Sequence, residues 1–151
     1  MNMSDRIAIM DRGRLVQVGP PREVYDRPRT AFAGRFLGEA TLIPGRAEGG
    51  AFRAGSGAVL PVSPGEGRCL LLRPERVAVL PAGAAAEGCV TLPGTVARVS
   101  FLGGTVRRAV EAGLGDLVLS DAPNGAAAEV EPGARVTLAW RPEDAVLLDA
   151  D

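Results

Sequence analysis

Residues 71–80 read LLRPERVAVL and residues 139–148 read AWRPEDAVLL, two stretches of the same design. In each, an apolar run leads into an Arg-Pro-Glu triplet, and a second apolar run follows the triplet. Proline donates no backbone hydrogen bond to a sheet, so these triplets fit corners between strands better than strand interiors. The repeat therefore predicts two related half-units of a single β module.

Short apolar runs separated by turn-forming residues extend outward from this repeat in both directions. The 151 residues include 20 glycines and 12 prolines but only 4% aromatic residues, so the core must consist of Val, Leu and Ala. Strands are expected at about 41–46, 51–54, 58–62, 68–72, 76–80, 94–102, 105–111, 116–120, 135–140 and 145–148, with loops at 81–87 and 121–125. Such short, closely spaced strands predict a mainly β fold, a small antiparallel barrel or sandwich.

The beginning of the chain follows a different pattern. Residues 6–18 form two short apolar runs around an Asp-Arg-Gly-Arg turn, which is typical of a β-hairpin. Pro21 suits the first turn of a short helix, and Thr30 suits the N-cap of a second helix that Gly38 would end. A lone hairpin has free edges and an apolar face, so we expect it to pack against the barrel or to pair with a second chain.

Composition excludes several kinds of catalytic site. The formal net charge is −1, all 17 basic residues are arginines, and the chain has neither lysine nor histidine. A phosphate-binding P-loop needs a lysine, and the common Ser or Cys nucleophile relays and zinc sites use histidine. Cys69 and Cys89 lack the spacing of a metal-binding pair. We therefore expect no catalytic, cofactor-binding or metal-binding residue in this chain.

The candidate functional residues are interpreted as ligand or interface residues, and five of them lie in the two repeated stretches, with Arg107 between the stretches. They are Arg73, Glu75, Arg107, Trp140, Arg141 and Glu143. The acidic members of the triplets stand beside arginines, which favours structural ion pairs over acid–base catalysis. The tryptophan favours a place in the core or an interface over a base-stacking platform.

Two alternative functions stay open at this point. Backbone amides, or Arg73, Arg107 and Arg141, could surround an anion, which would make the chain a small-ligand or oxyanion sensor. An oligonucleotide-binding barrel would need a basic groove and several aromatic platforms, and this nearly neutral chain is poor in both. We therefore expect no nucleic-acid partner.

The hairpin and helix segment, residues 4–38, resembles the end of the nucleotide-binding domain in ATP-binding cassette (ABC) importer ATPases of the polyamine, ferric-iron, phosphonate and maltose type. The matching phrases are SDRIAIMDRGRLVQVG, PREVYDRP and the Phe-Leu-Gly that ends the helix. Four later pieces are similar to the regulatory TOBE (transport-associated OB) domain of the same ATPases. These pieces are GEATLIPG at 38–45, LRPE at 72–75, VSFLGGT at 99–105 and VTLAWRPED at 136–144.

The resemblance implies a division into 1–38, a remnant of the nucleotide-binding domain, and 39–151, an OB-like TOBE domain related to MOP folds. It implies a non-catalytic regulatory and dimerisation role, because the Walker A, Walker B, Q-loop, signature and switch-histidine motifs have no counterpart here. ATP and Mg²⁺ would bind elsewhere in a longer subunit that couples ATP hydrolysis to solute import. The implied partners are a second copy of the chain and transmembrane permease subunits. The implied location is the cytoplasm, with the longer subunit on the cytoplasmic face of the inner membrane.

Overall fold

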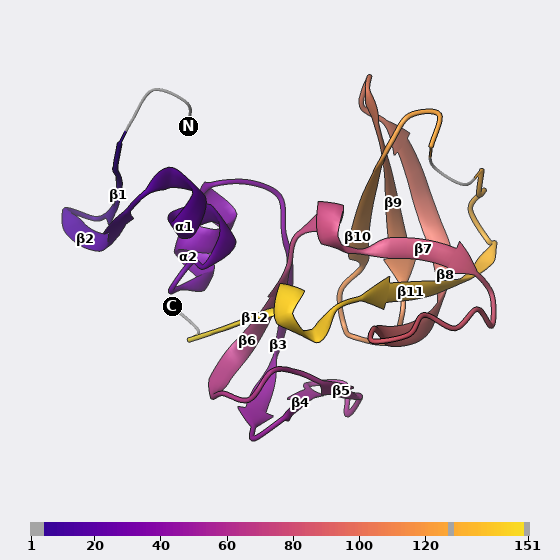
Figure 1. Ribbon diagram of the computed structural model, residues 1–151, viewed down its shortest axis with the longest axis horizontal. Coiled ribbons are helices and arrows are strands. Elements are labelled where there is room, and N and C mark those ends of the chain that lie inside the picture. Colours follow the sequence, from indigo (N-terminus) through magenta and orange to yellow (C-terminus); the bar gives the residue numbers. More distant parts are fainter. Residues whose placement is uncertain (1–4, 127–128, 150–151) are drawn as a thin grey trace.

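The computed structural model describes residues 5–126 and 129–149 and places the start of the chain beside a β body, as Figure 1 shows. The first segment contains β1 (Ile7–Asp11), β2 (Arg14–Gly19), α1 (Pro21–Asp26) and α2 (Ala31–Phe36). Arg12 and Gly13 both take positive φ, 53° and 78°, so the tight turn of the hairpin depends on a glycine. Thr30 accepts a hydrogen bond from the Ala33 amide at 3.1 Å and so caps α2 as expected.

Within the described residues after α2, ten strands and two 3-10 turns are present. The strands are β3 (Thr41–Glu48), β4 (Ala51–Ala54), β5 (Val59–Pro61), β6 (Gly67–Leu72), β7 (Ala78–Pro81), β8 (Val90–Phe101), β9 (Thr105–Glu111), β10 (Val118–Pro123), β11 (Arg135–Trp140) and β12 (Val146–Leu148). The turns are η1 (Pro74–Arg76) and η2 (Pro142–Asp144). The predicted loop at 121–125 is wrong in its first half, because β10 continues to Pro123 in register with β9.

These strands form two antiparallel sheets of five strands each, which confirms the predicted mainly β, OB-like class. One sheet has the order β10-β9-β8-β11-β7, and the other has the order β12-β6-β3-β4-β5. Apolar side chains from both sheets meet in one core, in which Phe52 and Leu72 pack with Val110, Leu138 and Trp140. The two sheets are therefore one packed body.

The two Arg-Pro-Glu triplets are the corners where the chain passes between the sheets. The path β6-η1-β7 leaves the second sheet for the first, and β11-η2-β12 returns the opposite way, with β6 paired to β12 and β7 paired to β11. Their backbones match closely: φ and ψ are −77° and 136° at Arg73, and −79° and 140° at Arg141. Each corner closes with hydrogen bonds of 2.9 and 3.3 Å. The repeat predicted from sequence is thus a repeat of backbone structure.

The opening segment contacts the β body through its helices. Ile9 of the hairpin packs with Val24 and Ala33 of α1 and α2, so the hairpin lies on the helices and not on the barrel, as Figure 1 also shows. Of the two expected arrangements, packing of the hairpin against the barrel is therefore not found, and pairing with a second chain stays a prediction. Helix α2 in turn lies against β6, where a β-carbon on Gly34 would stand 2.4 Å from Cδ1 of Leu71. The division at 38 and 39 stays a prediction.

Candidate functional site

Arg73, at the start of the first corner, is the polar centre of the contact between the helices and the β body. Its side chain is 4% exposed. Nη2 donates to the Tyr25 carbonyl at 3.0 Å, and Nη1 donates to the carbonyls of Gly34 at 2.9 Å, Gly38 at 3.2 Å and Glu39 at 3.3 Å. The last carbonyls of a helix lack intrahelical partners and favour a cation. One guanidinium therefore binds the ends of both helices.

Tyr25 completes this contact on the side of α1. The Arg73 guanidinium carbon lies 4.1 Å from the centre of the Tyr25 ring, within the range of a cation–π contact. The Tyr25 hydroxyl donates to the Glu75 carboxylate at 2.6 Å. Burial, followed by the hydrogen bond and charge of Glu75, raises the pKa of Tyr25 to about 12. Burial also lowers the pKa of Arg73, although an arginine keeps its proton.

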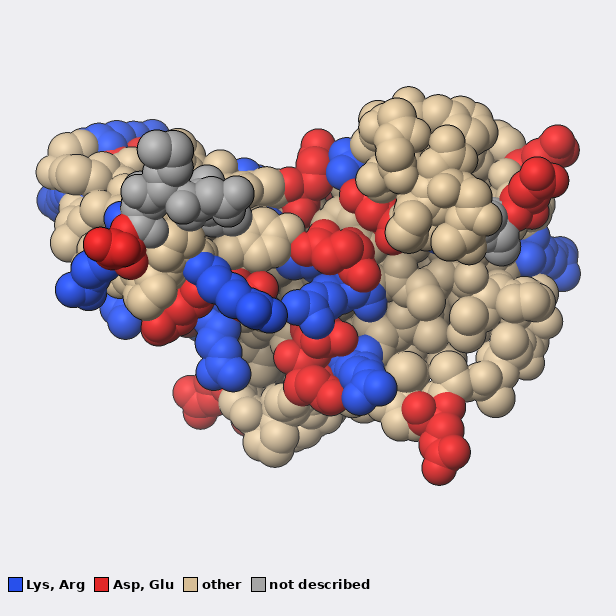
Figure 2. Space-filling model, turned by 45° about the horizontal axis from the view of Figure 1, so that its top comes forward, with Lys and Arg blue, Asp and Glu red and all other residues tan. Residues whose placement is uncertain are grey.

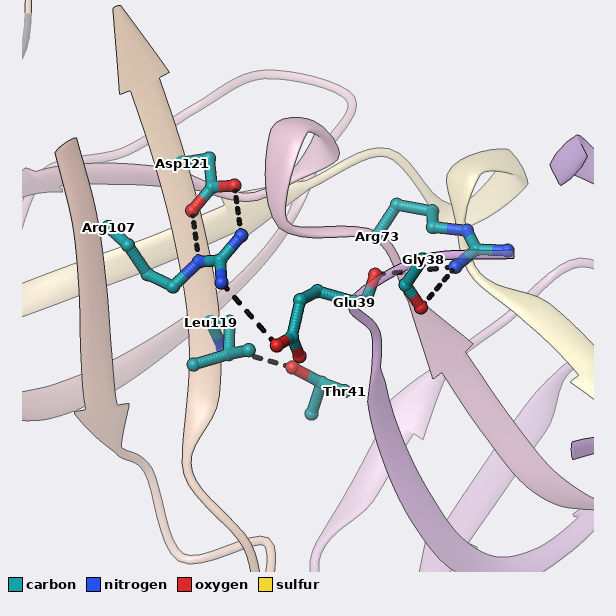
Figure 3. Close-up of polar contacts among 7 residues, drawn as sticks. All are labelled: Gly38, Glu39, Thr41, Arg73, Arg107, Leu119 and Asp121. Carbon is teal, nitrogen blue, oxygen red and sulfur yellow. Dashed lines mark hydrogen bonds and ion pairs between the residues drawn. The ribbon is translucent and has the colours of Figure 1, made fainter. Parts of the chain in front are cut away.

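Glu39, in the link between α2 and β3, joins Arg73 to a second arginine (Figure 3). Arg107 on β9 holds Asp121 of β10 with two bonds, Nε to Oδ1 at 2.8 Å and Nη2 to Oδ2 at 2.9 Å. Its Nη1 lies 3.6 Å from the Glu39 carboxylate. The bond to Asp121 is the main cause that raises the pKa of Arg107. We call Tyr25, Glu39, Arg73, Glu75, Arg107 and Asp121 the linker clamp.

A second set of bonds lies next to the linker clamp, along the free edge of β10. The Leu119 amide donates to Oγ1 of Thr41 at 2.9 Å, and Oγ of Ser120 donates to the Val77 carbonyl at 2.5 Å. The first bond joins β10 to β3, and the second joins β10 to the residue that precedes β7. Side-chain hydrogen bonds therefore connect β10 to two elements with which it forms no backbone ladder. We call this contact, with Arg108 beside Ser120, the barrel seam.

The second corner has the same backbone and very different surroundings. The side chain of Arg141 is 71% exposed, and that of Glu143 is 63% exposed, with 3.9 Å between Nη1 and Oε1. Asp144 lies 3.5 Å from Arg76 of the first corner. Of the six predicted residues, the structure thus joins Arg73, Glu75 and Arg107 in the linker clamp. It leaves Arg141 and Glu143 on the surface.

Trp140 is a core residue, 2% exposed, which confirms the core alternative expected for its side chain. Phe52 is fully buried as well, so neither ring is available for stacking on a base. The anion site imagined from Arg73, Arg107 and Arg141 is also wrong in this structure. The first two arginines already donate to carbonyls and carboxylates, and Arg141 lies on the other corner.

A groove of about 750 Å³ separates the helices from the second corner and β12. Its lining includes Arg27, Arg29 and Arg76 together with Asp26 and Asp144. Figure 2 shows basic and acidic side chains gathered together in the middle of the molecule, between the lobe at the left and the barrel at the right. Because charges of both signs line it, the groove has no electrostatic preference that would select a ligand class.

Sequence reasoning missed three members of the linker clamp, Tyr25, Glu39 and Asp121. Tyr25 and Glu39 lie far along the chain from the arginines that they meet, and Asp121 was assigned to a loop. The ladder register that places Asp121 opposite Arg107 is a property of the fold. Within the described ranges there is no cluster of His, Cys, Asp or Glu able to hold a metal ion, and no helix long and apolar enough to cross a membrane.

Comparison with known proteins identifies the family. Residues 70–148, more than half of the chain and including both corners, match the family described as the TOBE domain. The chain belongs to the TOBE domain family. The spermidine/putrescine import ATP-binding protein PotA of Acidothermus cellulolyticus is 33% identical over 95% of this chain and 40% of its own length. The Fe(3+) ions import ATP-binding protein FbpC 2 of Rhodococcus jostii is 35% identical over 77% of this chain and 32% of its own length.

The relatives of this TOBE protein are therefore ATP-binding subunits of importers, and the chain spans about two fifths of the length of PotA. Among solved structures, the cytoplasmic molybdate-binding protein ModG superposes with a TM-score of 0.57 at 16% identity. The match covers 74% of this chain and 95% of ModG. At that identity the likeness concerns the fold, and it agrees with the OB-like architecture described above.

Proposed function

We propose that this chain is a non-catalytic regulatory and dimerisation module of an ABC importer ATP-binding subunit. In the longer subunit, ATP hydrolysis would be coupled to solute import. That subunit would work with transmembrane permease subunits at the cytoplasmic face of the inner membrane. The relatives described above are import ATP-binding proteins, and this supports the proposed class of transporter.

The linker clamp is the observation that supports a regulatory role most strongly. Arg73 fixes the ends of α1 and α2 to the first corner, and Arg107 holds the link between them and the barrel. A partner that moved the β body would therefore move the helices as well. Since those helices resemble the exit from a nucleotide-binding domain, the linker clamp offers a rigid path between that domain and the barrel.

The absence of catalysis can be tested directly on the chain itself. The sequence contains no lysine for a P-loop and no histidine. We expect the chain to release no phosphate from ATP in the presence of Mg²⁺. We also expect neither ATP nor Mg²⁺ to change the midpoint of its thermal unfolding. Hydrolysis that is lost on heat inactivation and unaffected by repurification would overturn this part of the proposal.

Dimerisation is proposed to use the exposed second corner, where Arg141 and Glu143 have opposite charges on the same surface. In a two-fold contact each arginine can face the partner's carboxylate, because such interfaces are self-complementary. Sedimentation should show a dimer that is weakened by Arg141→Glu and by Glu143→Arg. The double charge exchange should restore it.

The two parts of this proposal fail in different ways. A monomer at every concentration would refute dimerisation, whereas a dimer insensitive to all three variants would refute only the placement of the contact.

A further inference from the structure

Gln17, on β2, is a polar residue on the face of the hairpin that lies against the helices. It is 6% exposed and stands opposite Ile9 in the ladder between β1 and β2. Ile9 packs with Val24 and Ala33 of the two helices. An amide group in such apolar surroundings is unfavourable unless its donor and its acceptor both find partners.

The backbone of the link between α1 and α2 satisfies both functions of the Gln17 amide. Nε2 donates to the Arg27 carbonyl at 3.1 Å, and Oε1 accepts from the Arg29 amide at 2.9 Å. The residue between these two is Pro28, which has no backbone donor. One side chain therefore bonds to the link on both sides of a proline and fixes the hairpin to it.

The same link meets the end of the β body one residue further along. Thr30 forms a parallel β-bridge with Asp149, the residue after β12, and Figure 1 shows the end of β12 beside the helices. We call residues 27–30 the strap. Gln17 attaches the strap to the hairpin, and the bridge attaches it to the end of β12.

The strap is separate from the linker clamp. Arg73 donates to one carbonyl before the strap, that of Tyr25, and to carbonyls after it, those of Gly34, Gly38 and Glu39. The linker clamp therefore joins the helices to the first corner, whereas the strap joins the hairpin to β12. The opening segment is thus connected to the β body at two different places.

The strand that the strap reaches leads directly to the second corner. Strand β12 begins two residues after η2, and the exposed Arg141 and Glu143 lie in and beside that turn. The corner closes through the Asp144 amide, which donates to the Arg141 carbonyl at 2.9 Å. The strap therefore connects the hairpin with the surface on which the dimer contact is proposed.

We propose that the strap is a conformational device that transmits a displacement of the hairpin to β12 and the second corner. Gln17 is its positioning residue, because the two bonds of its amide fix the hairpin to the strap. The proposal deepens the regulatory role proposed above by naming a route for it, and it rests on that role only for its use in a longer subunit. The coupling itself is a property of this chain and is measured on it.

The test is hydrogen exchange on the whole chain with Gln17→Met, a substitution of similar size that removes both bonds. The amide of Arg29 should exchange about tenfold faster, the factor expected for the loss of two hydrogen bonds of modest net strength. Amides of β12 and of Asp144 should also exchange faster, while amides of β11 should not change. Leu15→Met, at an exposed position of the same strand, is the matched control and should change none of them.

A chain that ends at Leu148 tests the coupling from the other side, because it lacks the bridge between Thr30 and Asp149. Equilibrium coupling is reciprocal, so the Arg29 amide and the amides of β1 and β2 should exchange faster than in the wild type. This chain keeps Gln17, and it decides the question alone if Gln17→Met does not fold.

Unchanged exchange at β12 and Asp144 in Gln17→Met, or at Arg29 in the shortened chain, would overturn the proposal. So would an equal acceleration of β11 and β12, since that indicates a general loss of stability. Each of these results leaves the proposed regulatory and dimerisation role standing, because sedimentation and phosphate release test that role separately.

Discussion

Replacing Arg73 by glutamine should loosen both helices from the β body at once. The side chain gives two short bonds, 2.9 Å to the Gly34 carbonyl and 3.0 Å to the Tyr25 carbonyl, and two longer ones. A hydrogen bond from a charged donor contributes about 1.5–3 kcal/mol, and a cation–π contact about 1 kcal/mol. Burial of the charge offsets part of this, because it is unfavourable. We therefore expect a loss of about 3 kcal/mol of unfolding free energy.

Urea unfolding followed by circular dichroism would measure this loss, and Arg141→Gln provides a matched control. Arg141 occupies the same position of an equivalent corner but is largely exposed, so its replacement should change stability by no more than about 0.5 kcal/mol. Arg73→Lys should recover little, because one ammonium cannot reach the carbonyls of two helix ends. Equal losses of unfolding free energy in Arg73→Gln and Arg141→Gln would refute the reasoning that burial of Arg73 against the helices distinguishes the two corners.

Three further predictions concern single contacts. The sole tyrosine, Tyr25, should titrate by ultraviolet absorbance near its pKa of about 12, and Glu75→Gln should bring this value closer to 10. Because folding raises the pKa of Tyr25, the stability that this group contributes is complete below pH 10 and is lost as the pH rises from 10 towards 12. Titration of Tyr25 near pH 10 would contradict its burial. Gly34→Val, measured by urea unfolding, should destabilise by about 1–3 kcal/mol because the new side chain meets Leu71; a neutral effect would mean that α2 does not lie so close to β6. Ser120→Ala removes both bonds of its hydroxyl at the barrel seam and should lower the thermal midpoint with a loss of about 1–2 kcal/mol, whereas an unchanged midpoint would refute a stabilising seam.

The sequence predicts local structure well where local chemistry determines it. The hairpin turn needs a glycine at positive φ, the α2 cap needs a hydroxyl, and a corner needs a proline that cannot join a ladder; all three are visible as residue types. For the same reason the two Arg-Pro-Glu corners were recognisable as a pair. Their shared backbone confirms that interpretation.

The candidate site could be predicted only in part. Whether an Arg-Pro-Glu triplet is buried or exposed depends on tertiary contacts that its local sequence does not show. Arg73 and Arg141 are each followed by Pro-Glu, yet α1 and α2 cover the first arginine and leave the second exposed. The helices that cover Arg73 come from more than thirty residues earlier. Local pattern also could not show that Arg108 faces inward, since that depends on the register between β9 and β10.

The central claim is that the helices and the β body form one mechanical unit through the linker clamp. Hydrogen exchange on the whole chain tests it most directly, by comparing amides of α1 and α2 with amides of β6 and β11. The account predicts that the helix amides exchange with the same opening free energy as the strands in the wild type and in Arg141→Gln. It also predicts that in Arg73→Gln they exchange faster than the strands. Helix amides that exchange independently of the strands in the wild type, or that are unaffected by Arg73→Gln, would contradict it.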